Sequence, residues 1–356
     1  MEIVRTLLHR RPELSATLLS VVPEAVFRDY LGAEPELSAR VSVVPFRADV
    51  GVVQRDGLSM DHDATLAALG DRFGDPRDDG PGSGVDRAAG ALAEVLAAHA
   101  PRVIVADVPP LAFAAARRLG VPSVAIASFD WSWIYAYYAE RTPRFASFAA
   151  LFRRLQGLAT AAVHLPPGPP LEGFSRVVEA APIARLPLVD VQRVRDRLGV
   201  PRGHRAVLAS FGGFGLEDAS RRIPRVDGVT WILAPPMEDL GRDDTRFIVR
   251  EPYLAVLAAC DAVLTKPGYG IVCEAARSRT RVLYTDRGDF PEYPWLVRWL
   301  DENMPSAHVP ASELGGDRGA RIVGDAIDAL FAQPERWPDR WDGAERAADV
   351  IEAQLG

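Results

Sequence analysis

Lysine is almost absent from this 356-residue sequence: of its 41 basic residues only Lys266 is a lysine, and the others are arginines. The two cysteines, Cys260 and Cys273, are too few for a disulfide framework. No apolar run is long enough to cross a membrane, and Met1–Arg5 lacks the apolar region of a signal peptide. These absences predict a cytoplasmic protein without a transmembrane segment, and they leave peripheral contact with a membrane open.

An excess of basic charge is absent too. The net charge is −7, and the arginines are scattered among 48 acidic residues rather than gathered in a tail. Both facts argue against a general nucleic-acid binder. No histidine–cysteine cluster has metal-ligand spacing, and capping of the following helical stretch explains Asp61-His62-Asp63 better than a metal does. We therefore expect no nucleic-acid partner, no bound metal and no other cofactor.

Short apolar runs alternate with longer helical patterns along the chain, in two sets. Strand–helix alternation with nearly continuous apolar strands predicts parallel sheets covered on both faces. The sequence therefore predicts an α/β fold of two doubly wound, Rossmann-like domains. The expected strands are 16–22, 41–45, 103–106, 124–127 and 161–165, then 206–211, 229–234, 246–249, 262–265 and 282–285; helical patterns include 86–98, 111–119 and 253–259.

The division between the domains is marked by proline-rich connectors at 166–170 and 181–187. We place the hinge near residue 185, which gives domains 1–185 and 186–335. Residues 336–356 contain an amphipathic pattern, 344–355, that predicts a C-terminal helix. The length of the chain agrees with two domains.

The first domain lacks the usual opening of its fold. A doubly wound domain begins with a buried strand, a glycine-rich turn and a helix. Here residue 1 already stands in a helical pattern, so 16–22 is expected to be the second strand. Because the first strand is normally central, its absence should leave hydrogen-bonding groups and apolar surface unpaired.

Lys266 opens the most informative motif, Lys266-Pro267-Gly268-Tyr269-Gly270, between an apolar run and a helical stretch over 271–279. A turn leading into a helix N-terminus binds anions through backbone N–H groups and the helix dipole. Lysine adds a compact charge that the planar fork of arginine does not reproduce. Phosphate binding is therefore favoured over an accidental surface lysine. Glu274, one turn further along, can accept ribose hydroxyls or remain a solvated helix charge; the adjacent loop favours ribose.

Two more segments follow expected strands of the second domain, where ligands of open α/β sheets bind. Gly212 and Gly213 offer exposed backbone to a phosphate or an acceptor, or form an ordinary turn. Segment 286–295, which includes Glu292, mixes carboxylates with aromatic residues. This mixture suits sugar hydroxyls and sugar faces, with a plain surface loop as the alternative.

The first domain offers candidates for the acceptor side. Asp107 ends the strand expected over 103–106, where a general base can meet a bound hydroxyl; a helix N-cap is the alternative. Segment 128–138 is dense in aromatic residues, some of which must be core. Asp130, Trp131 and Tyr135 are the residues of this segment that we assign to an acceptor pocket.

Together these residues resemble the GT-B class of nucleotide-sugar glycosyltransferases. The second half resembles the donor domain of the bacterial lipid-II N-acetylglucosaminyltransferase, where a glycine loop and the following helix hold the diphosphate and a helix glutamate holds the ribose. Gly268, Gly270 and Glu274 match that pattern. A closer likeness, over nearly the whole chain, is to the glycosyltransferase-like N-terminal region of plant arabinokinases and to stand-alone bacterial homologues. Segments 49–58, 106–110, 129–135 and 266–270 carry it.

The resemblance implies two domains facing a cleft, with a UDP-linked sugar in the 190–335 half and an unknown acceptor entering from the first half. Lys266 and the helix N-terminus, rather than a metal, would stabilise the diphosphate leaving group. Relatives begin with a strand and a Gly/His-rich loop facing the acceptor, and this sequence begins just after it. One alternative is a nucleotide-sugar epimerase, whose chemistry can use the same two-domain cleft. The other is a catalytically silent nucleotide-sugar binding module, which the missing opening loop favours. The sequence names neither the sugar, nor the acceptor, nor the anomeric outcome.

Overall fold

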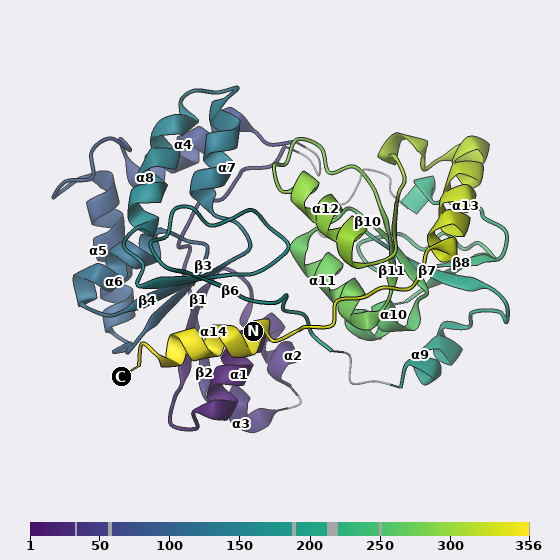
Figure 1. Ribbon diagram of the computed structural model, residues 1–356, viewed down its shortest axis with the longest axis horizontal. Helices are drawn as coiled ribbons and strands as arrows, with labels where there is room; N and C mark the ends of the chain where they lie inside the picture. The colour runs from purple at the N-terminus through teal and green to yellow at the C-terminus, as the bar shows by residue number, and fades with distance from the viewer. Residues whose placement is uncertain (33, 56–58, 187–189, 212–219, 249–250, 356) are drawn as a thin grey trace. The chain divides into compact units, whose positions relative to one another are not determined.

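The computed structural model describes residues 1–32, 34–55, 59–186, 190–211, 220–248 and 251–355 (Figure 1). The chain forms two compact units, and every strand pairing in both units is parallel. Unit 1 consists of 1–53, 60–183 and 341–356, and unit 2 of 54–59 and 184–340. The break after Ile183 lies close to the hinge expected near residue 185.

Unit 1 contains two separate parallel sheets. β1 pairs with β2, and the other four strands follow the order β3-β4-β5-β6. The strands of unit 1 are β1 (Ala16–Ser20), β2 (Val41–Pro45), β3 (Ile104–Asp107), β4 (Ser123–Ala127), β5 (Ala161–His164) and β6 (Val177–Glu179). Its helices are α1 (Glu2–Arg10), α2 (Glu24–Leu31), α3 (Pro35–Ser38), α4 (His62–Phe73), α5 (Gly84–Ala97), α6 (Leu111–Leu119), α7 (Trp131–Ala139), α8 (Phe145–Gln156) and α14 (Gly343–Glu352).

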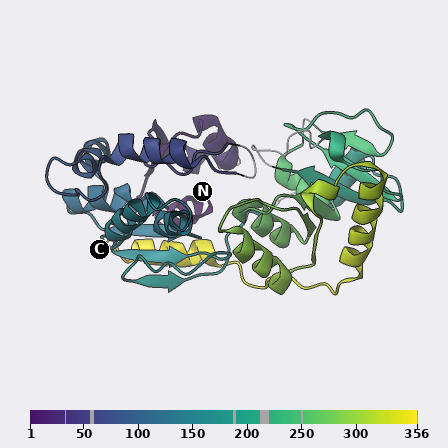
Figure 2. The same ribbon diagram turned by 90° about the horizontal axis from the view of Figure 1, so that it is seen from above.

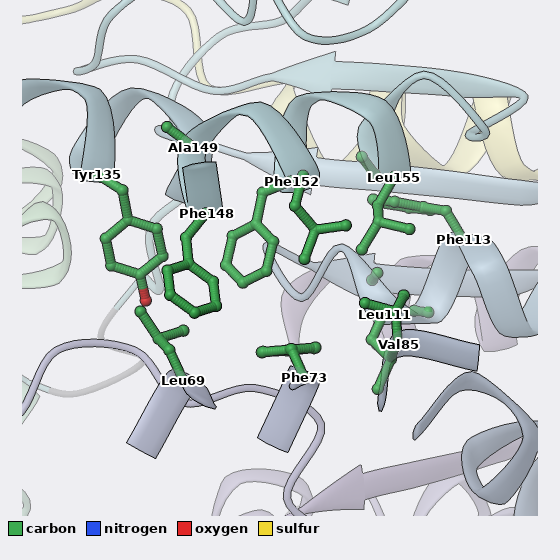
Figure 3. Packing of buried hydrophobic residues seen from close by; sticks show 14 of the residues in the cluster. Leu69, Phe73, Val85, Leu111, Phe113, Tyr135, Phe148, Ala149, Phe152 and Leu155 are labelled. Atoms are coloured by element: carbon green, nitrogen blue, oxygen red, sulfur yellow. The ribbon is translucent and has the colours of Figure 1, made fainter. Parts of the chain in front are cut away.

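The four-stranded sheet is covered on both faces, which explains why β4 is buried at every position. Ala125 and Ala127 face the core beneath α4 to α8, where aromatic and aliphatic side chains from α4, α6, α7 and α8 interlock (Figure 3). Val124 and Ile126 face the opposite way, against Ile351 and other residues of α14. Figure 1 and Figure 2 show α14 (yellow) lying along this sheet. Successive side chains of a strand point to opposite faces of the sheet, so the residues of β4 contribute alternately to the two apolar layers.

The C-terminal helix belongs to unit 1, although the sequence offered it only as a separate segment. α14 packs beside α1, and Ile3 and Leu7 of α1 join the same apolar cluster on β4 and β5. The start of α14 requires a glycine, because a Cβ at Gly343 would lie 2.2 Å from the carbonyl oxygen of Ala181. The two ends of the chain therefore cover one face of the sheet together.

Unit 2 is one six-stranded sheet with the order β12-β11-β10-β7-β8-β9. Its strands are β7 (Arg205–Ser210), β8 (Val229–Leu233), β9 (Thr245–Phe247), β10 (Ala262–Thr265), β11 (Arg281–Tyr284) and β12 (Ser306–His308). Its helices are α9 (Val191–Leu198), α10 (Tyr253–Ala259), α11 (Tyr269–Ser278), α12 (Tyr293–Asn303) and α13 (Gly316–Ala332), with 3₁₀ turns η1 (Ser220–Arg222) and η2 (Ala311–Glu313).

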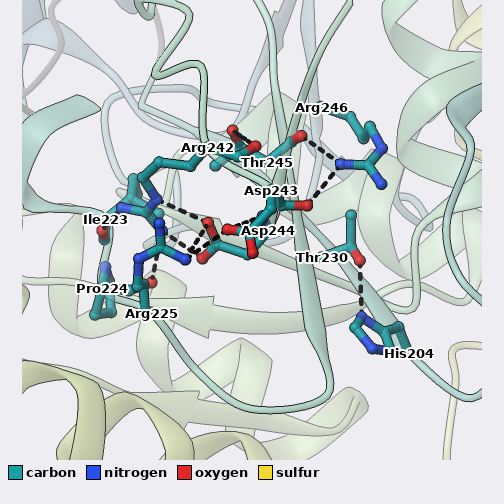
Figure 4. A network of polar contacts seen from close by, with 10 residues as sticks. All are labelled: His204, Ile223, Pro224, Arg225, Thr230, Arg242, Asp243, Asp244, Thr245 and Arg246. Carbon is teal, nitrogen blue, oxygen red and sulfur yellow. Dashed lines mark hydrogen bonds and ion pairs between the residues drawn. The ribbon is translucent and has the colours of Figure 1, made fainter.

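A polar network fixes the loop that leads into β9 (Figure 4). Both oxygens of Asp244 accept hydrogen bonds from Arg242, at 2.8 and 2.5 Å, and Arg242 also donates to the carbonyl of Ile223 at 2.7 Å. Arg225 pairs with Asp243 at 2.6 Å. These residues precede β8 and β9, so the network stabilises the edge of the sheet at which the strands begin. It does not involve the carboxyl ends of the strands.

All the strands expected from the sequence are present, with bounds that differ by a few residues. β6 and β12, each of three residues, were not expected from the sequence. The sheet expected in the first domain is divided into two. Among the residues that the structure describes, β1 pairs only with β2 and β3 only with β4.

Candidate functional site

The strand order of unit 2 defines where a ligand should bind. The chain passes from β7 to β8 and β9 on one side, then returns to place β10 on the other side of β7. In open α/β sheets the crevice lies beyond the carboxyl ends of the strands at such a reversal. Ser210 ends β7 and Thr265 ends β10, and the two are paired in register. The switch point of unit 2 therefore lies beside the segment that begins with Lys266.

The turn between β10 and α11 is built as the sequence predicted. Thr265 is buried, and its hydroxyl donates to the carbonyl of Lys266 at 3.1 Å. The chain then leaves the sheet and enters α11 with Gly268 as the N-cap, in an extended conformation. A glycine N-cap supplies no side-chain acceptor to the first-turn N–H groups. An anion at this end of α11 would supply the acceptor.

The two glycines of the turn have different surroundings. A Cβ at Gly270 would meet nothing within 4 Å, so the backbone there borders open space. A Cβ at Gly268 would lie 3.1 Å from Nη1 of Arg287, which donates to the carbonyl of Pro267. Arg287 thus places a second cation at the loop. Arg287 lies in segment 286–295, but it was assigned no role from the sequence.

Glu292, in the loop that follows β11, is a buried carboxylate. It is 7% exposed, its Oε2 has no hydrogen-bond partner within the described part of the chain, and Arg287 lies 3.8 Å from its Oε1. Burial raises the pKa of Glu292, against the opposing effect of Arg287. Asp286 differs, because it accepts from the backbone N–H of Ala311 at 3.0 Å and pairs with His308 at 2.9 Å. The carboxylate of Asp286 is therefore engaged in hydrogen bonds that stabilise its own loop.

Glu274 is neither solvated nor unpaired. Nε of Arg185 donates to its Oε1 at 2.6 Å, and Nη2 lies 2.5 Å from the same oxygen. Ser210 and Tyr253 form a hydrogen bond of 3.0 Å between their hydroxyls. Burial raises the pKa of Tyr253 to about 12, with a further contribution from the charge of Glu274. Glu274 is therefore an ion-paired and not a solvated helix charge, and neither Arg185 nor Tyr253 was assigned a role from the sequence.

The remaining donor-side candidates can be placed only in part. Gly212 and Gly213 lie outside the described residues. Tyr269 begins α11, and burial raises its pKa, with a contribution from the charge of Glu292. Lys266, Gly268, Tyr269, Gly270, Glu274 and Glu292 therefore all belong to unit 2, on or next to the loops that follow β10 and β11.

Asp107 ends β3 in unit 1, and it does not cap a helix. α6 begins after Pro110, which is its N-cap residue, so the capping alternative is wrong. Asp107 retains exposed surface, but protein surrounds its carboxylate closely enough that burial raises its pKa. The amino group of Met1 lowers that pKa, and the charge of Asp49 raises it.

Asp49 is a neighbouring, half-buried carboxylate that was assigned no role from the sequence. Its Oδ2 accepts a 2.8 Å hydrogen bond from Nε1 of Trp131, and burial raises its pKa. Trp131 stacks on Tyr135, with ring centroids 5.8 Å apart. Tyr135 is 0% exposed and donates to the carbonyl of Gly51 at 2.7 Å. Tyr135 thus belongs to the core that supports Trp131, and the acceptor-side assignment rests on Trp131.

Two other acidic residues serve as helix caps. Asp130 is 2% exposed and caps α7, accepting from the N–H of Trp133 at 2.9 Å. Asp61 caps α4, accepting from the N–H of Ala64 at 2.9 Å, as expected for the Asp-His-Asp sequence. Capping accounts for the carboxylate of Asp130, which has little surface to offer an acceptor. Within the described residues no group of three or more His, Cys, Asp or Glu side chains is arranged to hold a metal ion.

The two parallel α/β units give the chain the GT-B fold of glycosyltransferases, which comparison with solved structures confirms. UGT89C1 of Arabidopsis thaliana in complex with UDP-L-rhamnose superposes with a TM-score of 0.64 at 14% identity, over 99% of this chain and 95% of that one. The calicheamicin glycosyltransferase CalG4 gives 0.57 at 15% identity, over 100% and 91%. At these identities the likeness concerns the fold.

Among curated proteins, L-arabinokinase of Arabidopsis thaliana is 25% identical over 91% of this chain. The chain spans 32% of the length of that enzyme. No protein-family model matches the sequence. None of the helices in the described residues is both long enough and apolar enough to span a bilayer.

Proposed function

We propose that this protein is a glycosyltransferase that binds a UDP-linked sugar in unit 2 and transfers the sugar to an acceptor without a metal. The observation that carries the proposal is the loop at the β7/β10 switch point, where Lys266 precedes a glycine-capped helix that is open at Gly270. The fold adds support, because UGT89C1 has been solved with UDP and with UDP-L-rhamnose. The arabinokinase region and the lipid-II transferase donor domain remain the proposed functional parallels.

Each group of the loop has a proposed part. Lys266 and the first-turn N–H groups of α11 would hold the diphosphate. Glu274 would accept the ribose hydroxyls, and the unused oxygen of Glu292 would accept a hydroxyl of the transferred sugar. Tyr269 and Gly268 shape the turn that brings these groups together.

Transfer would form a bond between the acceptor oxygen and the anomeric carbon, while the bond from that carbon to the diphosphate oxygen breaks. UDP leaves with the electron pair, and Lys266 and the dipole of α11 stabilise its charge. Asp107 is the proposed base for the acceptor proton. Its raised pKa suits proton transfer better than that of an ordinary aspartate.

A catalytically silent nucleotide-sugar binding module is the second candidate. The division of the sheet in unit 1 favours it, since β3, which ends at Asp107, pairs with β4 alone among the described residues. Proton NMR of the protein with a UDP-sugar separates the possibilities. Release of UDP that requires an acceptor indicates a transferase, and conversion of the sugar within intact UDP-sugar indicates an epimerase. Binding without either reaction indicates the silent module.

Calorimetry with UDP and with uridine tests the donor site directly. Lys266→Ala should weaken UDP binding by about 1–3 kcal/mol, the usual loss for a hydrogen bond to a charged group, and should affect uridine far less. Arg225→Ala is the matched control, because it also removes one cation from unit 2, but from the network before β9. Equal losses for UDP and uridine, or an equal loss in the control, would remove Lys266 from the phosphate site.

A further inference from the structure

Arg287 carries more hydrogen-bond donors than its neighbours accept. A guanidinium has five N–H donors, and Nη1 of Arg287 donates to the carbonyl of Pro267. Nη2 lies 3.8 Å from Oε1 of Glu292, which is an ion-pair distance but too long for a hydrogen bond. Among the described residues, Arg287 forms no further hydrogen bond or ion pair. Its side chain is 19% exposed, so it is not sealed from solvent.

The guanidinium of Arg287 is held in one place. Pro267 lies in the turn before α11, so its carbonyl keeps Nη1 at the start of that helix. The guanidinium carbon also lies 5.5 Å from the ring centre of Phe290, which is 6% exposed. The backbone before Arg287 is anchored as well, because Asp286 accepts from the N–H of Ala311. A group fixed in this way loses little conformational freedom when it binds a ligand.

Gly268 leaves room for this guanidinium. It is the N-cap of α11, with φ −148° and ψ 161°, an extended conformation that alanine also adopts. The backbone at this position therefore does not require glycine. A Cβ here would lie 3.1 Å from Nη1 of Arg287, which is tighter than an ordinary van der Waals contact. The missing side chain thus lets Arg287 approach the start of α11.

Arg287 lies between two subsites of the proposed donor site. In a nucleotide sugar the ribose, the α-phosphate, the β-phosphate and the sugar follow one another. The proposed ribose acceptor is Glu274, in the second turn of α11, and the proposed sugar acceptor is Glu292. Arg287 contacts the turn before α11 through Pro267 and approaches Glu292 to 3.8 Å. It therefore lies on the sugar side of the diphosphate.

We propose that Arg287 binds the β-phosphate, which carries the sugar, and that Gly268 lacks a side chain to admit the guanidinium. The assignment depends on the donor site proposed for unit 2. A planar guanidinium donates to two oxygens of one phosphate at once, whereas the ammonium of Lys266 acts as a point charge. The two cations therefore have different tasks. A nucleoside monophosphate offers no group to Arg287, so the donors are nucleoside diphosphate sugars.

Calorimetry with UDP, UMP and uridine tests the proposal on the whole chain. Arg287→Ala should weaken UDP binding by about tenfold or more, the usual effect of losing hydrogen bonds to a charged group. It should leave the binding of UMP and uridine nearly unchanged. Arg287→Lys keeps the charge but loses the planar fork, so it should recover only part of the affinity for UDP.

Arg298→Ala is the matched control. Arg298 is also an arginine of unit 2 that pairs with a glutamate, Glu302 at 2.8 Å, but it lies in α12. Its replacement removes the same charge from the same unit and should leave all three affinities unchanged. Thermal denaturation followed by circular dichroism shows whether each variant remains folded.

Gly268→Ala gives a second test, because this variant keeps Arg287 and disturbs only the position of the guanidinium. The added Cβ requires Nη1 to move by a few tenths of an ångström. The substitution should weaken UDP binding less than Arg287→Ala does. In the Arg287→Ala background it should have no further effect, because the group that it displaces is gone.

Four results would overturn the proposal. Unchanged UDP affinity in Arg287→Ala, beside a loss in Lys266→Ala, would remove Arg287 from the diphosphate and leave the proposed donor site standing. Equal losses for UDP and UMP would exclude the β-phosphate as its ligand. An equal effect of Gly268→Ala in both backgrounds would contradict the role given to Gly268. Failure of the wild type to bind UDP would overturn both the proposed donor site and the role of Arg287.

Discussion

The ion pair between Arg185 and Glu274 leads to a specific expectation about nucleotide affinity. If Glu274 holds the ribose, a ribose hydroxyl must share or displace Arg185, because two nitrogens of Arg185 approach Oε1 at 2.5 and 2.6 Å. Both of these contacts fall on Oε1 of Glu274. We expect Arg185→Ala to release Oε1 and to strengthen the binding of both uridine and UDP.

The size of this gain in affinity follows from the solvent exposure of the Arg185–Glu274 ion pair. The side chain of Glu274 is 14% exposed, but that of Arg185 is 38% exposed, so solvent screens the pair. Pairs of this kind contribute about 1 kcal/mol or less. The affinity gain should therefore not exceed about fivefold. Glu274→Gln should weaken uridine and UDP by similar factors, unlike Lys266→Ala, because the ribose is common to both ligands.

A double-mutant cycle is the appropriate assay. Calorimetry on the wild type, Arg185→Ala, Glu274→Gln and the double variant should show that the gain from Arg185→Ala disappears once Glu274 has been replaced. An equal gain in both backgrounds would mean that Arg185 acts on the nucleotide independently of Glu274. A loss of affinity in Arg185→Ala would mean that the arginine orients Glu274 and does not compete with the ribose.

Three other changes have defined outcomes. Burial raises the pKa of Glu292, so ionisation of this carboxyl group destabilises the fold as pH rises through the raised pKa. Glu292→Gln should therefore increase the melting temperature at pH 7 and give no increase near pH 4. The same substitution should weaken the binding of a UDP-sugar more than the binding of UDP. Gly343→Ala should destabilise unit 1 by about 1–3 kcal/mol through overpacking against Ala181. The control Gly324→Ala meets only a 3.6 Å contact, and thermal denaturation should find it neutral or stabilising. Chelation by EDTA should leave UDP-sugar binding unchanged in calorimetry, and recovery of lost binding by added Mg²⁺ would contradict the metal-free assignment.

Much of the fold could be predicted because its strands are buried on both faces. β10 is buried throughout, so its four residues form an uninterrupted apolar run ending at Thr265, and the sequence indicated its bounds correctly. Hydrophobic periodicity and composition predict the structure of one segment at a time. They could not show that α14 returns to unit 1 to pack beside α1, because that contact joins the two ends of the chain.

The candidate site could be proposed from the sequence for the same reason. Lys266, Gly268 and Gly270 stand within a few residues of one another, so their proposed role in binding phosphate could be inferred from spacing. Arg185 and Arg287 reach the loops from other parts of the chain, and among so many arginines neither is distinguishable by type. Their roles appear only when the fold brings them to Glu274 and Pro267.

Asp107, the proposed base, ends β3, and the charge of Asp49 adds to the effect of burial in raising its pKa. Asp49 also accepts the hydrogen bond from Trp131, so the proposed base and the acceptor-side tryptophan share one neighbouring carboxylate. A change at Asp49 should therefore alter both the basicity of Asp107 and the position of Trp131, and the Lys266 loop, which belongs to unit 2, should be unaffected.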